Sequence, residues 1–242
     1  GMGRHGVRDH LIIVNFPGEV RVRQIIEEFK RDAQHRKREI ILVAHEIESL
    51  PFDIDQVSFV RGWPLEQETY ERANIAHARQ AIVLSTGYED LRSDSMVASI
   101  AFVINNANPE MSVVAECLDP KHAALFNVSD RVSLVYPLRM ANNLLVQETQ
   151  DVGVHMLTHA ITSNQIEGSL VSTRVEGDME RSLPYKEVAK QFLDHEVNLV
   201  GVIRGESVHV RFESLDLAED DRLVYISSTR HDWTTVRSML DL

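Results

Sequence analysis

The chain has 242 residues, of which 43% are hydrophobic, so it can bury at least one substantial core. Its 37 acidic residues against 25 basic ones give a net charge of -12, which repels phosphate backbones and argues against general nucleic-acid binding. A single cysteine, Cys117, excludes an internal disulfide framework, and no apolar run reaches the length that crosses a bilayer.

The first half of the chain repeats an apolar, β-rich run, a turn and a helical pattern. This rhythm is typical of βαβ units, and near-continuous apolar runs suit parallel strands that are covered on both faces. Strands are predicted at residues 10–16, 39–46, 56–62, 80–86, 112–118 and 131–137. Helices are predicted between them at residues 19–32, 65–78, 94–107 and 121–128. The order predicts an α/β fold with a Rossmann-like, doubly wound parallel sheet.

A longer helical pattern follows the sixth strand, from residue 138 to residue 161, with Gly153 as a break or kink. It carries more apolar residues than one sheet can cover. We therefore expect a crossover segment, part of which packs on a second copy of the chain or on the next domain.

The rhythm then changes to short strands close together, which is typical of a small α+β domain. Strands are predicted at residues 168–175, 197–206, 207–214 and 221–228, and helices at residues 185–195 and 232–240. The predicted organisation is a Rossmann-like subdomain at 1–137, crossover and dimerisation helices at 138–164, and the α+β subdomain at 165–242.

The turn after the first strand lacks the glycines that cradle a pyrophosphate in dinucleotide-binding proteins. Asn15, Pro17 and Val20 occupy the three glycine positions, with Gly18 between them. Asn15 can adopt a left-handed conformation, so the bend itself is preserved. Pro17 has no N–H, however, and Glu19 places a carboxylate at the start of the helix. NAD(H) and NADP(H) are therefore predicted to bind poorly.

Glu46 ends the second strand, where an acidic residue can bond a ribose hydroxyl. A glutamate at the end of a strand is more often a solvated loop residue. The candidate nucleotide-binding residues are Asn15, Gly18 and Glu46.

Several motifs occur in an order that resembles one family. They are "HLIIVNF", "VRGWPLEQETYERANIAHARQAIVLS", "SDSMVASIAF", "SVVAECLDPKHAALF", "RVSLVYP" and the tail "HEVNLVGVIRGESVHVRFESLDLAEDDRLVYISS". In the tail, Asp220 or Asp221 stands at the family's usual turn. The chain thus resembles the RCK/KTN family, whose TrkA-N and TrkA-C type domains regulate potassium channels and potassium transporters.

The resemblance implies a non-catalytic, ligand-sensing domain at the cytoplasmic face of the membrane. Such domains dimerise, often assemble into an octameric ring, and act on the membrane pore domain of the parent channel. The family commonly binds nucleotides at the turn after the first strand. Some channel members sense calcium through carboxylates instead, and Asp94 and Glu116 match two of those positions. Leu118 departs from the pattern where a further carboxylate would stand.

The chemistry of Asp94 and Glu116 leaves alternatives open. Both carboxylates suit Ca²⁺ or another divalent cation, although calcium takes six to eight oxygens and would need further ligands. Asp94 can instead cap the helix that starts beside it. Glu116 stands in an apolar strand, where a buried lone carboxylate is costly, so it needs a cation or a basic partner.

Three other functions are compatible with the sequence. One is a regulatory subunit of a potassium transporter, and another is an NAD-dependent oxidoreductase, against which the altered turn counts. The third is a structural ring-forming domain that binds no ligand.

Overall fold

The computed structural model describes residues 6–163, 168–212 and 214–242. The chain divides into two compact units, Gly1–Val152 and Gly153–Leu242, which are treated separately below. The boundary predicted between residues 164 and 165 lies outside the described residues.

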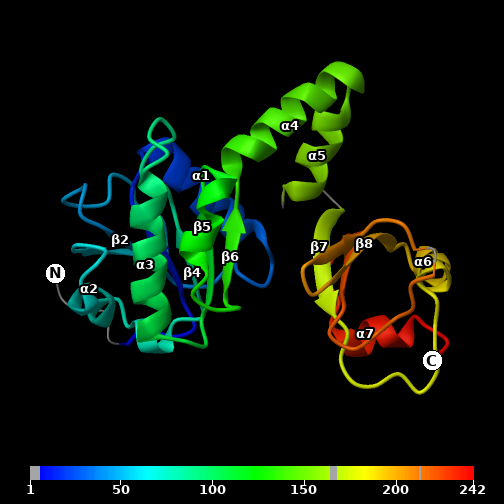
Figure 1. The fold of residues 1–242 in the computed structure, drawn as a ribbon. Helices are drawn as coiled ribbons and strands as arrows, with labels where there is room; N and C mark the ends of the chain where they lie inside the picture. Colours follow the sequence, from blue (N-terminus) through cyan, green and yellow to red (C-terminus); the bar gives the residue numbers. More distant parts are fainter. Residues whose placement is uncertain (1–5, 164–167, 213) are drawn as a thin grey trace. The chain divides into compact units, whose positions relative to one another are not determined.

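The first unit contains a six-stranded parallel sheet in the order β3-β2-β1-β4-β5-β6 (Figure 1). The strands are β1 (Leu11–Val14), β2 (Ile40–Ala44), β3 (Val57–Arg61), β4 (Gln80–Val83), β5 (Ser112–Glu116) and β6 (Val132–Val135). Every residue of β1 and β2 is buried, which explains why their sequences are continuously apolar. The predicted doubly wound sheet is confirmed.

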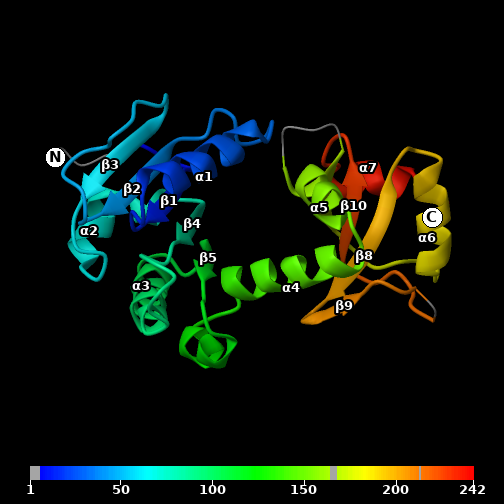
Figure 2. The same ribbon diagram turned by 90° about the horizontal axis from the view of Figure 1, so that it is seen from above.

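Helices cover both faces of this sheet. Successive residues of a strand point to opposite faces, and in β1 the side chains on both faces are apolar and buried. Helix α1 (Glu19–Arg31) packs on the face that contains Leu11 and Ile13. Helix α3 (Ser93–Ala107) packs on the face that contains Ile12 and Val14. Figure 2 shows α1 and α3 on opposite sides of the sheet. None of the described helices combines the length and the apolar character that crossing a membrane requires.

Two predicted helices are shorter or tighter than expected. The pattern at residues 65–78 forms α2 (Gln67–Arg72) and a 3₁₀ turn η1 (Ile75–His77), separated by Asn74 in a left-handed conformation with φ 52°. The pattern at 121–128 forms the 3₁₀ helix η2 (Pro120–Phe126), which the Asp119 side chain caps at the N–H of Lys121. The left-handed Asn74 thus interrupts the helix that the apolar spacing alone extended, and Asp119 fixes the start of η2.

The predicted break at Gly153 is confirmed. Helix α4 (Pro137–Gln150) ends before it and α5 (Val154–Thr162) begins after it, and Gly153 adopts φ 103°, which favours glycine. No residue of α4 is buried within the chain, and its Met140 and Leu145 side chains are 61% and 68% exposed. The apolar surface expected in this segment is therefore present and uncovered on α4.

The second unit contains an antiparallel sheet in the order β7-β10-β8-β9 with helices packed on it. Its elements after α5 are β7 (Ser169–Arg174), α6 (Tyr185–Leu193), β8 (Asn198–Arg204), β9 (Ser207–His209), β10 (Arg222–Ser227) and α7 (Trp233–Ser238). The predicted small α+β fold is confirmed, although the strand expected at 207–214 already ends at His209.

A buried carboxylate links three elements of the second unit. Asp221 is fully buried and accepts hydrogen bonds from Arg204 Nε at 2.7 Å and Nη2 at 2.8 Å, and from the Tyr185 hydroxyl. Burial alone would raise the pKa of Asp221, but the hydrogen bonds from Arg204 and Tyr185 lower it below the ordinary value. The ionised carboxylate therefore joins the turn before β10 to β8 and α6.

Candidate functional site

The candidate site lies at the carboxyl ends of the central strands of the parallel sheet. Strand β1 pairs with β2 on one side and with β4 on the other, so the strand order reverses between β1 and β4. Open α/β sheets bind their ligands in the crevice at such a switch point. In this chain Asn15, Ser85 and Glu116 follow or end the three strands that meet there.

The turn after β1 keeps its bend without the glycines. Asn15 has φ 79° and is 2% exposed, and its Nδ2 donates to the Leu84 carbonyl at 2.8 Å. The side chain therefore ties β1 to the end of β4. Gly18 precedes α1 with φ 152°, and its carbonyl accepts from the N–H of Val22 at 3.1 Å. A side chain at position 18 would have open space, so backbone conformation is the reason for glycine.

An ion pair occupies the switch-point crevice. Arg21, on the first turn of α1, forms a salt bridge with Glu116 at the end of β5. Arg21 Nη2 also donates to the Tyr88 hydroxyl at 2.6 Å, and its guanidinium carbon lies 4.8 Å from the centre of the Tyr88 ring. The side chains of Arg21 and Glu116 are 31% and 10% exposed. The basic partner that the sequence required for Glu116 is therefore Arg21.

Glu116 has two further donors. Its Oε1 accepts from the N–H of Ser85 at 2.9 Å, and its Oε2 accepts from the Tyr88 hydroxyl at 2.5 Å. Burial and the hydrogen bond to Glu116 raise the pKa of Tyr88 to about 12, so the phenol remains a donor at neutral pH. Both oxygens of Glu116 are thus engaged by protein groups.

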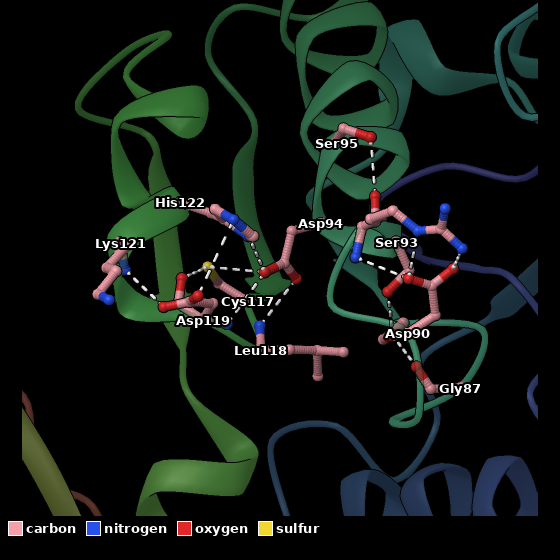
Figure 3. Close-up of polar contacts among 12 residues, drawn as sticks. Gly87, Asp90, Ser93, Asp94, Ser95, Cys117, Leu118, Asp119, Lys121 and His122 are labelled. Carbon is pink, nitrogen blue, oxygen red and sulfur yellow. Dashed lines mark hydrogen bonds and ion pairs between the residues drawn. The ribbon is translucent and has the colours of Figure 1, made fainter.

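Asp94 belongs to a second, separate set of contacts (Figure 3). It is fully buried on α3, and its carboxylate accepts from the N–H of Leu118 at 2.8 Å and of Asp119 at 3.0 Å. Its Oδ2 lies 2.8 Å from His122 Nδ1 and 3.8 Å from Cys117 Sγ. Asp94 therefore fastens the start of α3 to the loop that follows β5.

The alternative that Asp94 caps its own helix is wrong. Helix α3 begins at Ser93, and its N-cap position is Arg92, whose side chain forms no cap hydrogen bond. As the second helical residue, Asp94 turns its carboxylate across to the Leu118 and Asp119 amides instead. The same contacts affect Cys117, because burial and the nearby Asp94 carboxylate raise the pKa of its thiol to about 11.

Glu46 has local contacts only in the part of the chain that the structure describes. Its Oε2 accepts from the N–H of His45 at 3.0 Å and lies 3.6 Å from His45 Nδ1. The His45 ring contacts the edge of Trp63, with ring centres 4.3 Å apart. These contacts orient the end of β2 without joining Glu46 to the Arg21 and Glu116 pair.

Within residues 6–163, 168–212 and 214–242, no group of three or more His, Cys, Asp or Glu side chains is arranged to hold a metal ion. Asp94 and Glu116 take part in different hydrogen-bonded clusters, so a cation would have to displace the donors of each. The calcium site at Asp94 and Glu116 and the nucleotide site at Asn15, Gly18 and Glu46 stay predictions.

Sequence reasoning missed two residues of the crevice. Arg21 occurs in an amphipathic helix, where an arginine is usually a solvated surface residue. Tyr88 lies in a loop with no periodic pattern. The available signal was Glu116 itself, since a carboxylate in an apolar strand requires a partner from a neighbouring element.

Comparison with known proteins gives one family match. Residues 6–115 match the model of the calcium-activated potassium channel slowpoke-like RCK domain. No curated protein matches the sequence significantly.

Solved structures give further comparisons. The human SLO3 gating ring matches 96% of this chain and 46% of its own length, with 12% identity and a TM-score of 0.68. The GsuK RCK domain matches 94% of this chain and 47% of its own length, with 16% identity and a TM-score of 0.43. The TrkA-N domain of the Escherichia coli inner membrane protein ybaL matches 59% of this chain and 97% of its own length, with 16% identity and a TM-score of 0.43.

The chain spans about half the length of the SLO3 and GsuK chains that it matches. The similarity to the SLO3 gating ring supports the fold alone. The family match adds that residues 6–115, within the first unit, are similar to an RCK domain, as the order of motifs in the sequence predicted.

Proposed function

We propose that the chain is a non-catalytic regulatory domain at the cytoplasmic face of a membrane, where it forms part of the gating ring of a potassium channel. The match of residues 6–115 to the slowpoke-like RCK domain carries this proposal. The fold shared with the SLO3 gating ring supports it. The partners are further copies of the chain and the pore domain of the parent channel.

The exposed surface of α4 supports self-assembly. Met140 and Leu145 are 61% and 68% exposed, and Val146, on the next position, is 57% exposed. Fully burying a Met or Leu side chain contributes about 1.5–3 kcal/mol, and a two-fold interface counts each residue twice. Residues five and six positions apart lie on different sides of a helix, so a second copy that wraps around α4 would bury several large apolar side chains.

The switch-point crevice supports a role without a nicotinamide cofactor. An oxidoreductase needs amide donors for the pyrophosphate at the N-terminus of α1, where this chain has Pro17 and Glu19. The Arg21 and Glu116 pair also connects α1 to β5 across the same crevice. Titration calorimetry with NADH is expected to give no binding heat. Micromolar binding would favour the oxidoreductase alternative.

Sedimentation velocity tests the proposed assembly directly. The wild-type chain is expected to sediment as a dimer or larger species, and the double variant Met140→Glu, Leu145→Glu as a monomer, because each copy would bury two carboxylates in the interface. The matched control is Val20→Glu, Leu193→Glu, which changes side chains that are 82% and 62% exposed on other helices. A monomeric wild type at tens of micromolar would contradict the proposal, as would equal assembly of both variants.

A further inference from the structure

A basic pocket lies at the amino ends of β1 and β2, whereas the Arg21 and Glu116 pair lies at the carboxyl ends of the strands. It has a volume of about 460 Å³ and is formed by the residues before β1 and the loop between α1 and β2. Four cationic and two anionic side chains line it: Arg8, Arg36, Lys37, Arg38, Asp9 and Glu39. The pocket therefore carries a positive surplus, although the chain as a whole has a net charge of -12.

Arg38 is the buried cation of this pocket. Its side chain is 10% exposed, and its Nη1 is buried without a hydrogen-bond acceptor in the described part of the chain. The nearest carboxylate oxygen to Nη2 is Asp9 Oδ2, at 3.8 Å, which is too long for a hydrogen bond. Burial lowers the pKa of Arg38. Buried charged donors normally have acceptors, so the described residues compensate the charge of Arg38 only in part.

Asp9 cannot fully compensate the charges of both of its basic neighbours. Its Oδ1 accepts from Arg79 Nη1 at 3.3 Å, while its Oδ2 faces Arg38. One carboxylate thus faces two guanidinium groups. Arg8 is held beside them, because its Nη2 lies 2.7 Å from His77 Nδ1. The excess positive charge is therefore built into residues that the fold positions.

The loop that carries Arg38 is ordered by its own contacts. The His35 ring stacks on Phe29 with ring centres 4.4 Å apart, and His35 Nδ1 lies 3.0 Å from Asp32 Oδ2. The N–H of Arg38 donates to the His35 carbonyl at 3.0 Å. A loop held in this way presents its basic side chains with little further ordering cost.

We propose that this pocket binds a phosphate-bearing anion, either a free di- or polyphosphate group or the phosphorylated headgroup of a lipid. Guanidinium groups match phosphate oxygens with paired N–H donors, and the exposed side chains of Arg36 and Lys37 add charge at the rim. The volume admits a group larger than a single monatomic ion. The site is independent of the proposed role in a gating ring.

Titration calorimetry with inorganic pyrophosphate at low ionic strength tests the pocket. Wild type is expected to bind, and Arg36→Gln, Lys37→Gln is expected to weaken the affinity at least about tenfold, because two charge-assisted contacts are lost. The charge-matched control Lys186→Gln, Arg237→Gln changes exposed residues of the second unit and should bind as wild type. Arg38→Gln is expected to abolish the rise in melting temperature that pyrophosphate causes.

Cosedimentation distinguishes the two sources of phosphate. Vesicles of phosphatidylcholine with phosphatidylinositol bisphosphate are compared with vesicles of phosphatidylcholine alone. Binding to the former that is lost in Arg36→Gln, Lys37→Gln identifies a lipid headgroup, whereas pyrophosphate binding without vesicle binding identifies a free phosphate compound. The proposal is overturned if wild type binds neither probe at low ionic strength, or if the pocket variant and the control variant bind equally well.

Discussion

Removing the charge of Glu116 is expected to destabilise the first unit by about 2 kcal/mol. Breaking a buried ion pair costs about 3–5 kcal/mol, whereas an exposed pair contributes about 0–1 kcal/mol. The Arg21 and Glu116 side chains, at 31% and 10% exposed, lie between these cases. Glu116→Gln keeps one acceptor oxygen for Ser85 or Tyr88 but leaves Arg21 without its counter-charge. For a unit of this size the loss corresponds to a melting temperature lower by about 4–8 °C.

Tryptophan fluorescence can follow the two units of the intact chain separately. Trp63 belongs to the first unit and Trp233 to the second, and the chain has no other tryptophan. In a Trp233→Phe background, urea unfolding followed at Trp63 gives the stability of the first unit. A double-mutant cycle of Glu116→Gln and Arg21→Gln should give a coupling energy of about 1–2 kcal/mol.

The control variant removes an exposed ion pair from α1, the helix that also carries Arg21. Glu19 and Arg23 are 48% and 44% exposed, so Glu19→Gln is expected to cost less than about 0.5 kcal/mol. The reasoning would be refuted by a coupling energy near zero together with a Glu116→Gln variant that melts at or above the wild-type temperature. The contacts of Glu116 would then contribute nothing to the free energy of unfolding of the first unit.

Three further predictions concern the other carboxylates. Asp94→Asn should lower the stability of the first unit by about 2 kcal/mol, because an amide donor would face the Leu118 or Asp119 N–H, while exposed Asp90→Asn should have little effect. The pKa of Asp221 in the folded chain is below its ordinary value of about 4, so the ionised carboxylate stabilises the second unit above that pH. This stabilisation is lost as the pH falls further, through the pKa of the folded chain. Unfolding followed at Trp233 should show this pH dependence in wild type and lose it in Asp221→Asn. If Asp94 and Glu116 are calcium ligands, millimolar calcium should raise the wild-type melting temperature and Glu116→Gln should lose that response; an unchanged wild-type temperature would contradict the calcium hypothesis, because both carboxylates already have protein donors.

The parallel sheet was predictable because its central strands are buried on both faces. Residues 11–14 and 40–44 are completely buried, so nearly every position in them had to be apolar. The break at Gly153 was predictable for a similar reason, because a glycine within a helical pattern marks a backbone conformation that other residues avoid. In each case a few neighbouring residues suffice to predict the backbone conformation.

The polar contacts of the candidate site were less predictable, because they join residues that are far apart along the chain. A carboxylate at position 116 of an apolar strand indicated that a basic partner was needed. The sequence around Arg21 did not identify that partner, because an arginine in an amphipathic helix is usually a solvated surface residue. Asp94 was ambiguous between a cap, a ligand and a cross-link. Only the packing of α3 beside the loop after β5 brings its carboxylate to the Leu118 and Asp119 amides.

The burial of Cys117 makes the chain a convenient background for site-specific labelling. The thiol is fully buried, and burial and the nearby Asp94 carboxylate raise its pKa to about 11, so little of the reactive thiolate forms at neutral pH. Maleimide reagents should therefore leave the native chain unmodified. A cysteine introduced at an exposed position of α3, such as Asn106, would then be the preferred attachment point for a fluorophore or spin label. Distances between such labels on neighbouring copies could be measured without removing the natural cysteine or disturbing its contacts with Asp94.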